Sequence, residues 1–119
     1  MISGTPYSPA KAFISFARDF FDALARDDVQ AALSRLHPVW SKKKFLSQLK
    51  DFIGSEHICS FENFTRSASP ILKQSESGYI LYHALPVQGK WSNIKAVFEF
   101  TQKPGTGYFL VSLRGFERL

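Results

Sequence analysis

The spacing of apolar residues changes along the chain, from a helical period before Gly54 to a period of two after it. Before Gly54, large apolar side chains recur every three or four residues at Phe13, Phe16, Phe20 and Leu24. Ser8 and Pro9 precede them as an N-cap and a first helical residue. The pattern therefore predicts an amphipathic helix over about residues 9–26.

Two more helices are predicted before the period changes. The Asp27-Asp28 pair caps a short helix that carries Val29, Ala32, Leu33 and Leu36. Pro38 stops this helix, because proline disfavours helical backbone in the residue before it. Ser41 is the predicted N-cap of the third helix, whose apolar stripe is Phe45, Leu49, Phe52 and Ile53. Gly54 ends this third helix.

The alternating second part predicts four strands, at residues 57–69, 79–87, 91–101 and 108–116. The segment 71–78, ILKQSESG, is predicted to be a mobile loop. Three helices followed by four strands with short turns predict an α+β domain, in which the helices pack on one face of a curved antiparallel sheet. We expect one domain over residues 1–119, with residues 1–8 as a tail.

Composition narrows the class of protein. The 119 residues carry a net charge of +5, one cysteine and three histidines. The single Cys59 excludes an internal disulfide and argues against a zinc site, so no metal and no cofactor are expected. The first residues carry no apolar leader and no stretch is apolar enough to span a membrane. The expected location is therefore the cytoplasm.

Aromatic residues make up 15% of the chain, which raises the question of whether they fill a core or line a pocket. Most phenylalanines follow the helix and strand periods and are predicted to be core. Tyrosine and tryptophan have a polar tip, so they are favoured at a pocket mouth or an interface. The candidates for such a surface are Trp40, Tyr79, Tyr82, Trp91 and Tyr108.

The layout resembles the nuclear transport factor 2-like superfamily, which includes ketosteroid isomerase and polyketide cyclases. The resemblance rests on the long aromatic helix ending in Ala25-Arg26-Asp27-Asp28, on Val39-Trp40 before a serine-capped helix, and on the closing strand from Gly107 to Phe116. It implies a cone-shaped sheet with a pocket at its mouth and pairing of two copies through the outer face of the sheet. Members of this superfamily range from enzymes to adaptors and bacterial immunity proteins, so the likeness alone does not assign a function.

Isomerase chemistry of this type needs a carboxylate base and acidic donors for the developing oxyanion. All five aspartates of this chain fall in the helical part, so no catalytic residue is carried over from the resemblance. His83 is the candidate for acid–base work, with Glu99 or Glu62 as its partner. The alternative is that His83, which shares a strand face with Leu81 and Leu85, is a hydrogen-bonded core residue.

The densest positive charge is Lys42-Lys43-Lys44, in the first turn of the third predicted helix. The helix dipole disfavours cations there, so the cluster suggests a role in holding an acidic protein surface, although a solvated charge run is the alternative. We predict a non-enzymatic protein-binding domain, with an immunity protein that neutralises a toxin as the specific hypothesis. The competing hypotheses are an isomerase- or cyclase-like enzyme and a ligand binder that uses the pocket. Nucleic acid is not expected, because the aromatic residues do not interleave with the basic ones.

Overall fold

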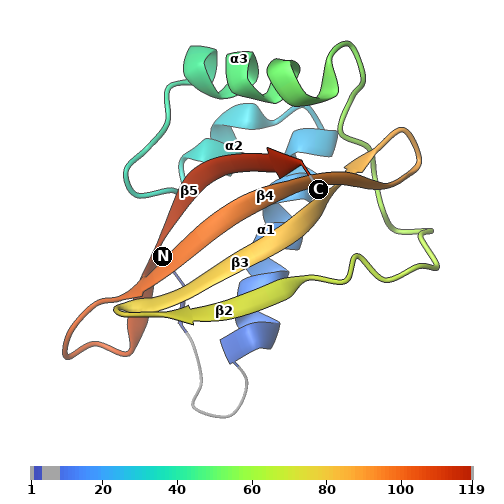
Figure 1. Ribbon diagram of the computed structural model, residues 1–119. Helices are drawn as coiled ribbons and strands as arrows, with labels where there is room; N and C mark the ends of the chain where they lie inside the picture. Colours follow the sequence, from blue (N-terminus) through green and yellow to red (C-terminus); the bar gives the residue numbers. More distant parts are fainter. Residues whose placement is uncertain (1, 4–8, 119) are drawn as a thin grey trace.

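The computed structural model describes residues 2–3 and 9–118 and contains three helices on one side of a five-stranded sheet (Figure 1). The helices are α1 (Pro9–Ala25), α2 (Val29–Leu33) and α3 (Lys42–Ile53). The strands are β1 (Ile2–Ser3), β2 (Ile71–Ser75), β3 (Gly78–Val87), β4 (Lys90–Gln102) and β5 (Tyr108–Arg118). Their order is β1-β5-β4-β3-β2, and all neighbouring pairs are antiparallel. The predicted α+β class and the three N-terminal helices are therefore confirmed.

The predicted N-caps of the second and third helices and the predicted end of the third are confirmed, whereas Ser8, the predicted N-cap of the first helix, lies outside the described residues. The Asp28 side chain accepts a hydrogen bond from the Ala31 N–H at the start of α2, and Ser41 accepts one from the Lys44 N–H at the start of α3. Gly54 ends α3 with a φ of 62°, a conformation that glycine adopts without steric cost. Helix α2 stops earlier than its apolar pattern suggested.

The strand predicted at residues 57–69 is wrong. This segment is a loop that makes one bridge to the sheet, between Ile58 and Val87. Its aromatic residues gave it a strand-like composition, but Phe61 and Phe64 instead pack against the ring of Trp91. In Figure 1 the loop passes the end of the sheet where β3 turns into β4.

The mobile loop predicted at residues 71–78 is also wrong, because Ile71–Ser75 forms the edge strand β2. Its side chains are mostly exposed, so it lacks the alternation of apolar residues that marks a half-buried strand. Backbone pairing with β3 holds it in place, in a register that joins Ile71 to Tyr82 and Ser75 to Gly78. Besides β1, the sheet thus has the expected four strands, but the first of these is formed by residues 71–75 and not by residues 57–69.

The N-terminal tail predicted over residues 1–8 includes Ile2–Ser3, which pairs with β5 as β1. Residues 1 and 4–8 lie outside the described part of the chain.

Phenylalanine rings fill the space between α1 and the sheet. Phe13 stacks on Phe100 with 4.1 Å between ring centroids, and Phe20 meets Phe98 edge to face at 5.3 Å. All four rings are fully buried. The sheet is not strongly curled, so the expected cone is not formed. The physical reason is that the α1 rings occupy the inner face of the sheet, where a cone would be hollow.

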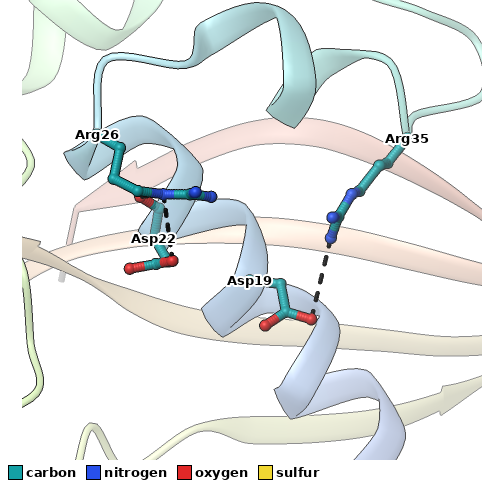
Figure 2. A network of polar contacts seen from close by, with 4 residues as sticks. All are labelled: Asp19, Asp22, Arg26 and Arg35. Carbon is teal, nitrogen blue, oxygen red and sulfur yellow. Dashed lines mark hydrogen bonds and ion pairs between the residues drawn. The ribbon is translucent and has the colours of Figure 1, made fainter.

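Two ion pairs involve aspartates on the exposed side of α1 (Figure 2). One joins α1 to the residue that follows it, and the other joins α1 to the segment that follows α2. Arg26 pairs with Asp22 at 3.4 Å, and Arg35 pairs with Asp19 at 3.9 Å. All four side chains are largely exposed, so these pairs contribute little to stability. They do give two of the helical aspartates a structural partner.

Candidate functional site

His83 lies at the centre of the inner sheet face and is fully buried. Its ring packs edge to face against Phe21 at 5.2 Å and against Trp91 at 5.4 Å. Nδ1 lies 2.9 Å from the Ala84 carbonyl oxygen, so the neutral ring donates there and carries its lone pair on Nε2. Nε2 is buried and has no hydrogen-bond partner in the described part of the chain.

The surroundings of His83 favour its neutral form. Burial is the largest cause and lowers the pKa of His83 below the ordinary value for histidine. The hydrogen bond to the Ala84 carbonyl opposes this shift, while the positive charges of Arg18 and Lys95 add to it. His83 is therefore a neutral imidazole at physiological pH.

Neither predicted carboxylate reaches His83. Glu99 stands opposite Ile80 in the sheet register, whereas His83 stands opposite Ala96. Because side chains alternate along a strand, Glu99 points to the outer face, and there it pairs with Arg114 at 3.6 Å. Glu62 is exposed in the loop that follows α3. The structure thus does not assemble a histidine–carboxylate pair from these residues.

The lysine cluster lies where the sequence placed it, in the first turn of α3. Lys42, Lys43 and Lys44 are exposed, and none of them forms an ion pair with a described residue. Two exposed aliphatic side chains flank them, Val39 at 58% and Leu46 at 39% exposure. We call this set, together with Trp40, the α3 basic surface.

Trp40 fixes the α3 basic surface to the sheet. Its indole N–H donates a hydrogen bond of 3.0 Å to the Leu113 carbonyl of β5. Its ring meets Phe45 edge to face at 6.3 Å, which joins the residue before the N-cap to the fourth helical residue as a hydrophobic staple. The Lys44 ammonium lies 5.0 Å from the centre of the same indole ring. This end of α3 is therefore held in one orientation.

The other predicted surface aromatics do not form one surface with Trp40. Tyr79 is half-buried on the inner face, with its ring 5.4 Å from that of Phe13. Tyr82 lies on the outer face, where the Lys73 ammonium is 5.4 Å from its ring centre. Tyr108 is 48% exposed at the start of β5, and Trp91 is the second residue of β4.

Sequence reasoning missed one polar site, on the outer face near Trp91. Lys95 stands between the apolar residues Ile94 and Ala96 of β4 and is only 8% exposed. It lines a groove of about 520 Å³ together with Lys90 and the loop residues 63–69, which include Arg66. The lysine itself was a visible signal, since it interrupts an apolar run, but the groove depends on a loop whose position the sequence does not reveal.

Within the described residues, no three His, Cys, Asp or Glu side chains are grouped closely enough to hold a metal ion. No helix in residues 9–118 has both the length and the apolar character needed to cross a membrane. Comparison of the chain with protein-family models, with curated proteins and with solved structures finds no match in any of the three.

Proposed function

We propose that this chain is a non-enzymatic binding domain that holds an acidic protein partner on the α3 basic surface. The observation that carries the proposal is that three exposed lysines without an ion pair to a described residue stand between two exposed aliphatic residues in the sequence, Val39 and Leu46. Protein interfaces commonly combine an apolar centre with a charged rim. A rim of one sign selects a partner of the opposite sign and accelerates the encounter.

The placement of the lysines supports this proposal. They occupy the first turn of α3, where the positive end of the helix dipole makes each cation unfavourable by some tenths of a kcal/mol. The chain thus accepts a small loss of stability at this site. An acidic partner offsets it, because its carboxylates interact favourably with both the lysines and the helix N-terminus.

The rigidity of the surface also supports binding. Trp40 is hydrogen-bonded to β5 and packed on Phe45, and Ser41 caps the helix through the Lys44 N–H. A surface that is already ordered loses little conformational entropy when a partner docks. The partner therefore meets a preformed platform.

The isomerase or cyclase alternative has less support. It requires a pocket on the inner face in which His83 meets a carboxylate. The inner face is instead occupied by buried phenylalanine rings, and Nε2 of His83 has no partner among the described residues. This arrangement favours binding as the function of the domain.

We also propose a family for this chain. The order of elements, a long aromatic helix, a short helix, a serine-capped helix and an antiparallel sheet, supports a relationship to the nuclear transport factor 2-like superfamily, although the sheet is not strongly curled. Among the functions of that group, we propose the immunity type, in which a basic surface neutralises an acidic toxin. Pairing of two copies through the outer sheet face is a separate proposal, measured by the mass of the protein in solution.

A capture experiment in the native organism tests the proposed function. The bait variants are Lys42→Glu/Lys43→Glu/Lys44→Glu and a matched control with the same change in charge, Lys11→Glu/Lys73→Glu/Lys103→Glu. All six lysines are exposed. We expect the wild type and the control to capture the same acidic protein and the first variant to lose it. Equal capture by both variants contradicts the proposal.

A further inference from the structure

A second site lies at the other end of the sheet and does not depend on the function proposed above. The loop residues 63–69 and the start of β4 enclose an open groove of about 520 Å³, a size typical of small-molecule sites. Its floor is formed by Ala84 and Lys95 on the outer face of the sheet. The groove and the packed core share Trp91, which lines the groove and whose ring lies 5.4 Å from that of His83.

The charges that line the groove all have one sign. Arg66, Lys90 and Lys95 are cationic, and no aspartate or glutamate belongs to the lining. None of the three forms an ion pair with a described residue. The nearest carboxylate by register is Glu117, opposite Lys95 on β5, but its side chain is exposed and makes no such pair. The groove therefore carries uncompensated positive charge.

Lys95 is the most informative of these residues. The residue as a whole is only 8% exposed, it lines the groove, and its ammonium forms no ion pair with a described residue. A cation at the end of a largely buried side chain is stabilised by an opposite charge beside it. A bound anion supplies that charge, and its oxygens also accept hydrogen bonds.

The groove is preformed, because Trp91 ties its two walls together. The indole N–H donates a hydrogen bond of 3.0 Å to the Arg66 carbonyl oxygen. The rings of Phe61 and Phe64 pack on the indole at 5.4 and 5.1 Å. The backbone from which the Arg66 guanidinium extends is thus held beside Lys90 and Lys95. Phe64 and Trp91 also give the groove an aromatic side.

We propose that this groove binds the phosphate group of a small phosphate monoester, held by Lys95, Arg66 and Lys90, with the organic part of the ligand against Phe64 and Trp91. A monoester carries nearly two negative charges at neutral pH, so it compensates three cations better than one carboxylate does. The planar guanidinium of Arg66 suits two phosphate oxygens at once. Hydroxyls of Thr65 and Ser67 on the loop add donors at the rim.

Titration with defined probes tests the proposal. The probes are phenyl phosphate, inorganic phosphate and benzoate, followed in the amide NMR spectrum of the folded, nitrogen-labelled protein. We expect phenyl phosphate to bind most tightly and to shift the amides of residues 63–69 and the Trp91 indole signal. Equal binding of benzoate or of inorganic phosphate overturns the proposal, as does an absence of shifts at millimolar phenyl phosphate.

Two sets of variants locate the site. Lys95→Met keeps the length of the buried side chain and removes its charge, and it should weaken phenyl phosphate binding by about tenfold or more. Because Lys95 is buried, a second variant, Arg66→Gln/Lys90→Gln, changes only exposed side chains and should have a similar effect. The control is Lys50→Gln/Lys103→Gln, whose lysines are exposed and lie outside the groove. Equal affinity of the Arg66→Gln/Lys90→Gln variant and the control overturns the proposal.

Discussion

The Lys44 ammonium lies 5.0 Å from the centre of the Trp40 indole ring. The indole N–H of the same tryptophan donates a hydrogen bond to β5. One tryptophan therefore orders the helix start, the strand behind it and one of the three lysines. The cation–π contact partly compensates Lys44 for its unfavourable place near the helix N-terminus. Lys42 and Lys43 have no comparable contact among the described residues.

The helix dipole predicts opposite effects for lysines at the two ends of α3. Lys42→Glu/Lys43→Glu replaces cations by anions in the first turn and should raise the free energy of unfolding by about 0.3–1 kcal/mol per site at low salt. Lys50→Glu, in the last turn of the same helix, should lower it. Urea unfolding of the three proteins measures both changes. Shifts of the same sign for both variants would contradict the explanation by the dipole.

The anchor of α3 can be weakened without removing its ring. Trp40→Phe keeps the packing on Phe45 but deletes the indole N–H, which leaves the Leu113 carbonyl without this donor. We expect a loss of about 1 kcal/mol in the free energy of unfolding. Trp40→Ala also removes the staple and should cost more. If Trp40→Phe is as stable as the wild type, the hydrogen bond does not hold the helix.

The turn between β2 and β3 is limited by a close approach of backbone. A Cβ atom on Gly78 would collide with the Phe100 carbonyl oxygen of β4, which is backbone and cannot move aside cheaply. Gly78→Ala should therefore destabilise the fold by about 1–3 kcal/mol. The neighbouring Ser77→Ala is the control, because Ser77 is exposed, and it should change stability by less than about 0.5 kcal/mol. Similar thermal midpoints for the two variants would show that the sheet absorbs the extra atom.

The burial of His83 predicts a dependence of stability on pH. Because its pKa is lowered in the folded protein, the unfolded chain binds more protons once the pH falls below the ordinary histidine value of about 6.5. The stability that this group contributes is therefore present above that value and is lost as the pH falls towards the lowered pKa of the folded state. The slope reaches at most about 1.4 kcal/mol per pH unit.

Two variants test this origin of the slope. His83→Phe places a ring between Phe21 and Trp91 that does not titrate, so its unfolding free energy should fall less steeply than that of the wild type from about pH 7 to about pH 5. His57→Gln changes an exposed histidine and should keep the wild-type slope. Parallel curves for His83→Phe and the wild type would exclude His83 as the source.

The parts of the fold that could be predicted are those with a local signal. The helices have periodic apolar stripes and cap residues such as Ser41 and Gly54, and in β5 buried residues alternate with less buried ones. In β3 and β4 the large apolar residues of the inner face recur with a period of two, although central residues of both faces are buried. The edge strand β2 could not be predicted from its side chains, because they are mostly exposed and its stability comes from pairing with β3. The loop at residues 57–69 was misread because its aromatic residues serve tertiary contacts with Trp91 rather than a strand face.

The candidate sites also divide into those with a local signal in the sequence and those without one. The lysines of the α3 basic surface are consecutive in the sequence, so their clustering was visible before the structure. The relation between His83 and Glu99 depends on the register of β3 against β4, which pairs His83 with Ala96 and leaves Glu99 on the other face. The groove at Lys95 depends on a loop that crosses the sheet end. Both are long-range arrangements that no local pattern encodes.

The most direct test of the central claim is a calorimetric titration of the captured acidic protein against the Lys42→Glu/Lys43→Glu variant. This variant is expected to be at least as stable as the wild type, so a loss of binding cannot be a loss of folding. If the α3 basic surface holds the partner, the affinity should fall by about tenfold or more. It should be unchanged in the control Lys11→Glu/Lys103→Glu. Wild-type affinity in the Lys42→Glu/Lys43→Glu variant would contradict the account.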